Sequence, residues 1–355
     1  MKPEYLYAGV MVFVLLIITI ILAIYYILFD AKNKNRYNRE VLRHLEIWIS
    51  RAILEELERN DKGGFDIPAK FKRILQNKEA KKLVIDELLH TKKSLVGASA
   101  DNIVLLYEQL GLKMESLIKM RSPLWHVKAR GIQELYEMDQ KDTQRSIYKY
   151  TNSSEEFVRN EAQTGIIHLL GFQGLRFLDI VSYPISEWQQ LKMIDQLSQL
   201  PFTELPNLHR WLKSPNPTVV AFALKITDFY QQFHMHDMVI ETLRHYKENV
   251  RIQAVTTLGR ITNDNTANIL VEHFPKEKFA VKQKILDVLT LIATPAQMEF
   301  LFELLNDENN YIKLKAAKAL ARCGNYGLQV LTAKATMQPH PYANILSHVK
   351  EEISN

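Results

Sequence analysis

The segment His234-Met235-His236-Asp237, with His245 nearby, comes closest in this sequence to a cluster of metal ligands. Imidazole and carboxylate groups are common ligands for zinc and other transition metals. Two histidines that are two positions apart do not share a helix face, and this segment falls at a turn between helical patterns. We therefore interpret it as a surface turn and predict no metal site.

Motifs that carry catalysis do not occur elsewhere in the sequence. It contains no H-E-x-x-H, no G-x-x-x-x-G-K, no G-x-S-x-G and no dinucleotide-binding glycine pattern. Gly171-Phe172-Gln173-Gly174 lies between helical segments and follows no strand, so we interpret it as a loop. The single cysteine, Cys323, excludes an intramolecular disulfide and a cysteine-rich metal site. We predict no catalytic residues and no bound cofactor.

A hydrophobic residue returns along the chain at an almost fixed interval of 30 or 31 residues. The eight anchor positions are Val96, Val127, Val158, Gln189 (the one polar exception), Val219, Val250, Val281 and Ile312. A fixed period of this length is typical of a stack of similar units, each of which buries its apolar face against its neighbours.

Three further positions repeat relative to the anchor. The fourth residue on is small in six copies: Ala100, Gly131, Ala162, Ala223, Ala254 and Ala316. The eighth residue on is apolar in seven copies. The residue directly after the anchor is basic in five copies: Lys128, Arg159, Arg251, Lys282 and Lys313. The anchor and the eighth residue share one helix face, so we expect them to fill the core, while the small residue lets the paired helix approach closely.

Each period holds two helical patterns separated by a break. In the clearest unit, residues 295–305 form a first helix, 306–310 a turn and 311–322 a second helix, with Gly324 as its C-terminal cap. No stretch shows sustained alternation of apolar and polar residues, so strands are not expected. The sequence predicts an all-α fold: an α-solenoid of about nine helix pairs over residues 79–355, preceded by a single transmembrane helix.

The four tryptophans, Trp48, Trp125, Trp188 and Trp211, are spread over separate units. We interpret them as packing residues rather than as a ligand cage. Trp125 and Trp188 lie close to inter-helix turns, where partial exposure is expected. Trp48 belongs to an amphipathic helix expected over residues 40–59, and a short helix is expected near 69–77.

The second helix of each unit resembles the HEAT repeat, in particular its short form, which typically reads V-R-x-x-A-x-x-x-L-G. Residues 250–259 match this pattern position for position, and the copies that start at Val158 and Ile312 are close to it. The resemblance covers residues 80–350 and departs from the pattern at Gln189, Met193 and Ile285. It implies a stack of HEAT-like helix pairs whose inner surface binds other proteins or extended peptides.

The resemblance also implies a structural role for the five basic residues. In HEAT-like stacks such a residue often pairs with an acidic residue of a neighbouring unit. The acidic residues in suitable places are Glu155, Glu156, Glu248, Glu277 and Asp307. We interpret the five basic residues as a structural ladder of this kind, and the alternative is a stripe that binds anions.

Residues 1–30 have the character of a membrane anchor. From Tyr5 to Phe29 the chain holds 25 residues without a charge. As a helix this stretch reaches about 37 Å, against a hydrocarbon core of about 30 Å. The alternative is a cleaved signal peptide, but the apolar stretch is longer than usual and residues 25–30 offer no small-residue cleavage site.

Basic residues cluster directly after the apolar stretch: Lys32, Lys34, Arg36, Arg39 and Arg43. Basic residues near a span favour the cytoplasmic side, so we expect the N-terminus outside and the solenoid in the cytoplasm of a single-pass inner-membrane protein. Residues 31–78 then form a basic juxtamembrane segment with connecting helices. The same charges suit anionic lipid headgroups, although topology alone explains them.

The distribution of charge argues against a nucleic-acid partner. Residues 1–43 carry a net charge of +3 and the remaining 312 residues only +2. Sequence-independent binding to nucleic acid needs a dense basic face.

We therefore expect a non-enzymatic, membrane-tethered scaffold that binds a membrane-associated protein partner. It would be an accessory subunit of an assembly such as a glycosyltransferase, an exporter or a signalling complex. The alternative is a HEAT-repeat enzyme similar to bilin lyases or to alkyl-purine DNA glycosylases. A third interpretation is a sensor or adaptor whose soluble part binds a peptide.

Overall fold

The computed structural model describes residues 3–53, 64–201, 205 and 207–354. Within these ranges every regular element is a helix, as the sequence predicts, and no strand occurs. The chain divides into two compact units, Met1–Leu169 and Leu170–Asn355, which we call the N-terminal unit and the C-terminal unit. The last six residues of the predicted helix over 40–59 lie outside the described residues.

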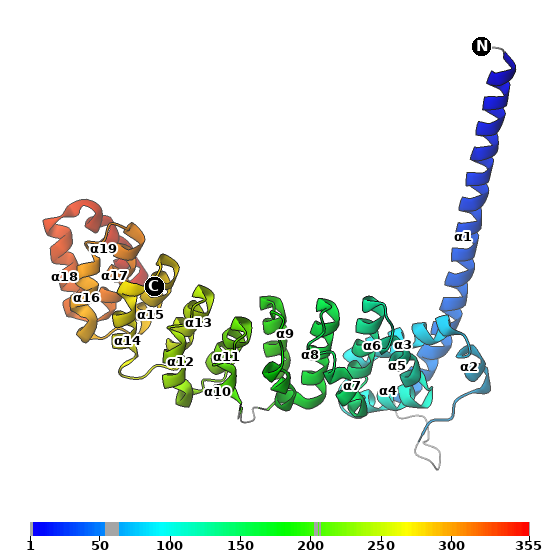
Figure 1. Ribbon diagram of the computed structural model, residues 1–355, viewed down its shortest axis with the longest axis horizontal. Coiled ribbons are helices and arrows are strands. Elements are labelled where there is room, and N and C mark those ends of the chain that lie inside the picture. Colours follow the sequence, from blue (N-terminus) through cyan, green and yellow to red (C-terminus); the bar gives the residue numbers. More distant parts are fainter. Residues whose placement is uncertain (1–2, 54–63, 202–204, 206, 355) are drawn as a thin grey trace. The chain divides into compact units, whose positions relative to one another are not determined.

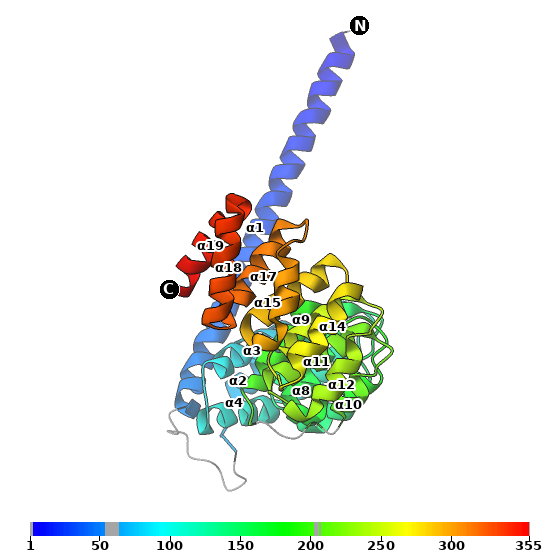
Figure 2. The ribbon, with the colours of Figure 1, turned by 90° about the vertical axis from the view of Figure 1, so that its left-hand side faces the viewer.

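The N-terminal unit begins with one continuous helix, α1 (Pro3–Ile53). The elements that follow are α2 (Ala69–Ile74), α3 (Lys78–Lys93), α4 (Ala98–Gln109), α5 (Leu112–Met120), α6 (Trp125–Glu137), the short 3₁₀ helix η1 (Lys141–Thr143), α7 (Gln144–Tyr148) and α8 (Glu156–Leu170). Figures 1 and 2 both show the N-terminal part of α1 extending beyond the other helices of this unit.

The two halves of α1 have opposite surroundings. Residues 11–29 are exposed and apolar. Further along the same helix, Val41, Leu45, Trp48 and Ile49 are buried in a core that they share with residues of α3 and α4. The spacing of these four residues places them on one helix face. One helix therefore combines a stretch suited to a membrane with a core element of the folded unit.

The C-terminal unit contains shorter first helices and longer second helices in alternation. Its elements are η2 (Gly171–Asp179), α9 (Glu187–Ser198), α10 (Leu208–Trp211), α11 (Pro217–Phe229), η3 (Phe233–Met235), α12 (His236–Thr242), α13 (Glu248–Leu258), α14 (Thr266–His273), η4 (Phe274–Lys276), α15 (Phe279–Ile292), η5 (Pro295–Gln297), α16 (Met298–Leu304), α17 (Asn310–Arg322), α18 (Asn325–Met337) and α19 (Pro339–Ser354).

Successive second helices pack side by side in this unit. The packed neighbours are α11 with α13, α13 with α15, and α15 with α17, and each second helix also contacts the first helix of its own pair. In Figure 1 these helices follow one another in chain order, with α10, α12, α14 and α16 beside them. From α3 to α19 the described elements group into nine consecutive pairs, so the chain is an α-solenoid, as the sequence predicts.

The starts of α11 and α17 have local causes. Asn216 and Asn309 each accept a hydrogen bond from a backbone N–H in the first turn of the helix that follows, and Pro217 occupies a first-turn position where its missing N–H is harmless. Gly324, which follows the C-cap residue Cys323 of α17, adopts a φ of +105°, a conformation that other residues rarely adopt.

The repeat register is confirmed from the second copy onward. Val158, Val219, Val250, Val281 and Ile312 are buried, as is the polar exception Gln189, whereas Val127 is half-buried. The fourth and eighth positions of these copies are buried as well. In the copy of Val219 the eighth position is Thr227, whose hydroxyl donates to the Ala223 carbonyl at 2.8 Å and is thereby satisfied in the core.

The prediction for the first copy is wrong. Val96 is 89% exposed and lies in the link between α3 and α4, not on a helix face. Gly97 has a φ of +64° and α4 begins only at Ala98. The buried residues of α4 are instead Asn102, Ile103, Leu106 and Tyr107. This helix packs against α1 as well as α3 and α5, so its buried face is rotated relative to that of the regular repeats.

Candidate functional site

Among the five basic ladder residues, Arg251 forms an ion pair with one of the acidic residues named above. Its Nε lies 2.9 Å from one carboxylate oxygen of Glu277 and 3.1 Å from the other, and both side chains are largely buried. Its Nη1 donates to the His245 carbonyl at 2.9 Å. The Arg251 guanidinium therefore connects the pair α12–α13 to Glu277, which lies between η4 and α15 of the next pair.

The other four ladder residues have different surroundings. Arg159 donates to the carbonyls of Ser153 and Ser154 at 2.7 and 3.3 Å. The Lys128 ammonium lies over the Tyr150 ring, and the Lys282 ammonium lies over the Phe274 ring. Lys313 is half-buried in α17. Cation–π contacts of this kind are worth about 0.5–1 kcal/mol at partly exposed sites.

His236, in the weak metal motif, is buried rather than at the surface. Its Nδ1 lies 3.1 Å from Asn263 Nδ2 and 3.4 Å from Asp237 Oδ1, and its Nε2 lies 2.8 Å from Thr266 Oγ1. The network joins α12 to α14 of the following pair. Across the described residues no group of three His, Cys, Asp or Glu side chains is placed to hold a metal ion.

The five basic residues that follow the apolar stretch all lie in α1. The side chains of Lys32, Arg39 and Arg43 are exposed, and those of Lys34 and Arg36 lie outside the described residues. Within the described part of the chain, α1 contains the one helical stretch that is long and apolar enough to cross a membrane, Met11–Asp30.

A buried polar network crosses the N-terminal unit and was not anticipated from the sequence. The Tyr107 hydroxyl donates to Ser116 Oγ at 2.8 Å, and Ser116 Oγ donates to Glu134 Oε2 at 2.6 Å. Glu134 also accepts from Lys119 Nζ and Arg130 Nε. Burial raises the pKa of Tyr107 well above its ordinary range. The network fixes α4, α5 and α6 to one another, and its charges are satisfied internally, which is typical of structure rather than catalysis.

Exposed aromatic residues recur at one place in the repeat. They lie within two residues of the first residue of a second helix: Trp125, Phe157, Trp188, Tyr246 and Phe279 are exposed, and Tyr311 at the corresponding place in α17 is half-buried. We call this set the aromatic edge. Phe157, Trp188 and Tyr246 are 63%, 75% and 71% exposed. The partial exposure expected for Trp125 and Trp188 is confirmed.

Members of the aromatic edge from consecutive pairs contact each other within each unit. In the N-terminal unit the rings of Trp125 and Phe157 are stacked, with centroids 4.9 Å apart. In the C-terminal unit the rings of Phe279 and Tyr311 meet edge to face at 6.2 Å. Leu124, beside Trp125, is also exposed. Contiguous exposed apolar side chains of this size mark interaction surfaces more often than scattered single residues do.

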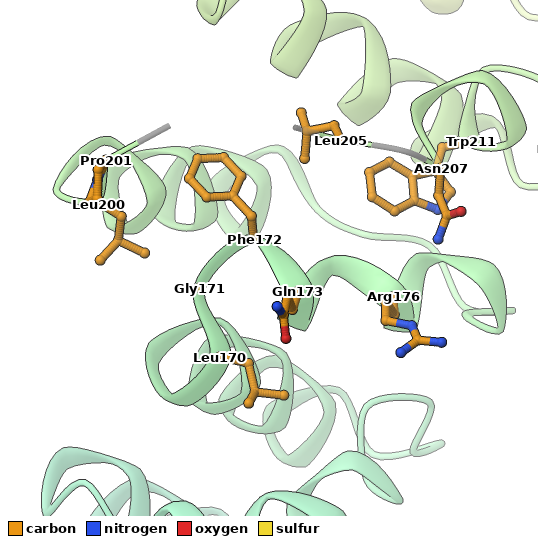
Figure 3. Close-up of a pocket in the computed structure, with 10 residues that line it drawn as sticks. All are labelled: Leu170, Gly171, Phe172, Gln173, Arg176, Leu200, Pro201, Leu205, Asn207 and Trp211. Atoms are coloured by element: carbon orange, nitrogen blue, oxygen red, sulfur yellow. The ribbon is translucent and has the colours of Figure 1, made fainter. Parts of the chain in front are cut away.

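A hollow of about 730 Å³ lies in the C-terminal unit, between η2, the residues that follow α9 and the short helix α10 (Figure 3). Phe172 and Trp211 face it together with Leu170, Leu200 and Leu205, and the polar groups at its border are Gln173, Arg176 and Asn207. Trp211 is fixed by a hydrogen bond from its Nε1 to Asp179 at 2.9 Å. The prediction of a loop at Gly171-Phe172-Gln173-Gly174 is wrong: these residues begin the 3₁₀ helix η2, and the first three of them line this hollow.

Comparisons with known proteins find similarity only at the level of helical repeat structures. No protein-family model matches the chain, and no curated protein matches it. Similar solved structures include a designed armadillo repeat protein, with 16% identity and a TM-score of 0.31 over 59% of this chain and 99% of that chain. Another is human deoxyhypusine hydroxylase, with 14% identity and a TM-score of 0.29 over 77% of this chain and 96% of that chain. A third is the CpcE–CpcF complex of phycocyanin lyase from Nostoc sp., with 12% identity and a TM-score of 0.28 over 82% of this chain and 98% of that chain.

Proposed function

We propose that this protein is a membrane-anchored scaffold of the HEAT-repeat type that binds a membrane-associated protein partner through its aromatic edge. The observation that carries the proposal is the repeated exposure of large aromatic side chains at the same place in successive helix pairs. Tyrosine and tryptophan dominate the binding energy of protein interfaces because they bury a large area at a small cost in side-chain entropy.

The continuity of α1 supports a retained anchor rather than a cleaved leader. The helix passes without a break from the apolar stretch into the buried residues Val41, Leu45 and Trp48. A signal peptide ends in a small-residue cleavage site, and residues 25–30 of this chain are large or charged. The span is therefore attached directly to a core element, which suits a fixed membrane attachment.

The orientation follows from the charges on either side of the span. Five basic residues between Lys32 and Arg43 follow the apolar stretch, and only Lys2 precedes it. We therefore propose that the solenoid lies in the cytoplasm, at the inner membrane, with the residues that precede the span on the other side. Confinement to the membrane surface raises the effective concentration of the solenoid toward other membrane proteins without any new contact.

We also propose that the chain is not an enzyme. The sequence holds none of the motifs that carry hydrolysis, phosphoryl transfer or hydride transfer. A glycosylase acting on DNA would need a basic groove, and the 312 residues after residue 43 carry a net charge of only +2. An enzyme of the bilin-lyase kind would carry pigment after purification, which gives a simple check of this part of the proposal.

The proposal is tested by recovery of partners from membranes. The full-length chain is purified in detergent beside a Trp125→Ala/Phe157→Ala variant, and co-purifying proteins are identified by mass spectrometry. We expect a reproducible membrane-protein partner with the first chain and its loss, by about tenfold or more, with the second. The matched control is Met114→Ala/Ile118→Ala, which removes two exposed apolar side chains of α5 outside the aromatic edge.

Two results would contradict the proposal. One is a full-length chain that is recovered alone from membranes in repeated preparations. The other is a partner that is retained by the Trp125→Ala/Phe157→Ala variant and lost from the Met114→Ala/Ile118→Ala control, because binding would then use the outer face of α5.

A further inference from the structure

A second pocket of about 500 Å³ lies in the C-terminal unit between the pair α12–α13 and the pair α14–α15. Five of its nine lining residues carry a formal charge. The residues are Leu243, Arg244, His245, Tyr246, Arg251, Glu272, His273, Lys276 and Glu277. We call it the Arg244–Lys276 pocket. It borders the aromatic edge at Tyr246, which lies in the link between α12 and α13.

One wall of the pocket is an internally satisfied ion pair. Arg251 is held by both carboxylate oxygens of Glu277 and by the His245 carbonyl. Both side chains are largely buried, so the pair has a fixed geometry. Because the two charges neutralise each other, this wall contributes little net charge toward an incoming ligand.

The border of the pocket carries cations that have no ion-pair partner in the described part of the chain. Arg244 and Lys276 are both exposed, and the acidic residue beside them is the exposed Glu272. A further cation, the Lys247 ammonium, lies 5.4 Å from the centre of the Tyr246 ring. After the Arg251–Glu277 pair is set aside, the lining keeps two cations, Arg244 and Lys276, and one carboxylate, Glu272, and Lys247 lies beside the lining residue Tyr246. An opening with this excess of positive charge attracts anions.

Two histidine rings at the pocket respond to these cations. Burial lowers the pKa of His245 and the charges of Arg251 and Lys247 lower it further, against the opposing effect of the hydrogen bond between the Lys247 N–H and His245 Nδ1. Burial also lowers the pKa of His273, where Arg244 and Lys276 act in the same direction and the carboxylates of Glu277 and Glu272 oppose them. The lowered pKa values favour the neutral form of both rings, which adds no charge to the pocket.

We propose that the Arg244–Lys276 pocket binds a carboxylate side chain of an acidic peptide segment in the partner that lies on the aromatic edge. The inference rests on the proposed function and deepens it by naming the chemistry of the partner. The Arg244 guanidinium offers a planar fork that matches a carboxylate, and the Lys276 ammonium supplies a second charge-assisted donor. Tyr246 offers an exposed ring for an apolar residue of the same segment, and this ring is tilted against that of His245, with centroids 4.6 Å apart.

A carboxylate suits this pocket better than a phosphate group does. Glu272 and Glu277 stand among its lining residues. Glu277 is already neutralised by Arg251. The remaining lining charges, Arg244 and Lys276 against Glu272, sum to +1. One carboxylate neutralises this charge, whereas a phosphate monoester with a charge near −2 leaves the site negative.

The test measures binding of a fluorescein-labelled peptide, Glu-Leu-Glu-Phe-Glu, to the full-length chain in detergent micelles by fluorescence anisotropy. The matched peptide has Gln in place of each Glu. We expect the Glu peptide to bind at least about tenfold more tightly than the Gln peptide, and Arg244→Ala/Lys276→Ala to abolish this difference. Arg260→Ala is the control for loss of charge. It is an exposed arginine of the same unit, outside the pocket, and we expect less than about a twofold change.

A second readout does not depend on how tightly the peptide binds. Histidine side chains are titrated by NMR, with signals assigned through His245→Asn and His273→Asn. Bound carboxylate raises the pKa of both rings because it stabilises their protonated forms, and Arg244→Ala alone raises the pKa of His273 because it removes a cation. A structural role for Arg244 would leave the response of His273 to the peptide intact.

Three outcomes would overturn the inference. They are equal binding of the two peptides, equal loss of binding in Arg260→Ala and in Arg244→Ala/Lys276→Ala, and displacement of the peptide by inorganic phosphate at lower concentration than by acetate. The assay uses no membrane partner, so it is separate from the co-purification experiment. If the Trp125→Ala/Phe157→Ala variant kept its membrane partner and the Glu peptide still bound, the proposed function would be rejected, but the assignment of the Arg244–Lys276 pocket as a carboxylate site would stand.

Discussion

Glu134 has no exposed side-chain surface, yet it carries a charge that three donors satisfy: Ser116, Lys119 and Arg130. Glu134→Gln removes the charge and keeps the shape. Hydrogen bonds to a charged group are worth about 1.5–3 kcal/mol, so we expect the free energy of unfolding to fall by about 2 kcal/mol. Urea unfolding followed by circular dichroism measures the change.

The control for Glu134 is Asp142, an exposed carboxylate whose ion pair with Lys113 is 2.7 Å long. Asp142→Asn is expected to cost less than about 1 kcal/mol because water screens the pair. Equal losses in the two variants would show that burial of the Glu134 network does not contribute to stability.

Asp139 gives a prediction for the dependence of stability on pH. Burial by itself would raise its pKa, but hydrogen bonds from His168 at 2.9 Å and Lys92 at 2.5 Å outweigh burial and lower the pKa to about 2. A carboxylate whose pKa is lower in the folded state stabilises the fold above its ordinary pKa of 3.8, and this contribution disappears as the pH falls through about 2.

Asp139→Asn is therefore expected to lower the melting temperature at pH 5 and to have progressively less effect between about pH 4 and pH 2. Asparagine is the correct replacement because residue 139 has a φ of +51°, a conformation that asparagine tolerates and alanine does not. Melting curves of both chains across this range provide the measurement, and a constant difference down to pH 2 would contradict the assignment.

Two glycines lie where neighbouring helices approach closely: Gly131, at the fourth position of the repeat, and Gly165 in α8. A Cβ at Gly131 would overlap backbone atoms of α5, namely Met120 N and, at 2.7 Å, Ser116 O. A Cβ at Gly165 would instead lie 2.6 Å from the Tyr136 ring, which is a side chain that is able to shift. We expect Gly131→Ala to cost about 3 kcal/mol and Gly165→Ala about 1–2 kcal/mol.

The order of these two losses is the informative result. Thermal unfolding of both variants measures it. If Gly165→Ala were the more damaging change, the spacing of α5 and α6 would not be set by residue 131. The fourth position of the repeat would then be small in that copy for another reason.

The second half of α1 is expected to contribute to the core of the N-terminal unit. Leu45→Ala removes a fully buried side chain and is expected to cost about 2–5 kcal/mol. Ile47→Ala, two residues along, changes an exposed side chain of the same helix and is expected to cost less than about 0.5 kcal/mol. Similar free energies of unfolding for the two variants would mean that the second half of α1 does not contribute to the core of the N-terminal unit.

The whole chain combines a hydrophobic helix with a solenoid of ordinary composition, and this combination predicts its behaviour in cells. The full-length protein is expected to stay with membranes after alkaline carbonate washing. A chain that starts at residue 31 retains the buried residues of α1 and is expected to be soluble and helical. Release of the full-length protein by carbonate would contradict the anchor, and an unfolded truncated chain would show that residues 1–30 are needed for folding.

Much of the fold was predictable because burial in a helix repeats along the chain. The 31-residue period identified the second helices from Val127 to Ile312, and the exposed position of Val96 was missed because α4 packs against α1, a partner that the regular repeats lack. The sequence indicated partial exposure of Trp125 and Trp188, but it did not show that Phe157, Tyr246 and Phe279 are exposed at the same place in the repeat.

By itself the sequence determined the all-α class, the paired helices and the apolar span, since each depends on residue spacing within a single helix or turn. The tertiary structure decided which charges meet. Arg251 pairs with Glu277 across 26 positions, and Glu248 pairs with Lys278. Arg244 and Lys276 line one pocket although 32 positions separate them. Whether two such side chains meet in space depends on how one helix pair is rotated against the next. A pattern within one helix carries no information about that rotation.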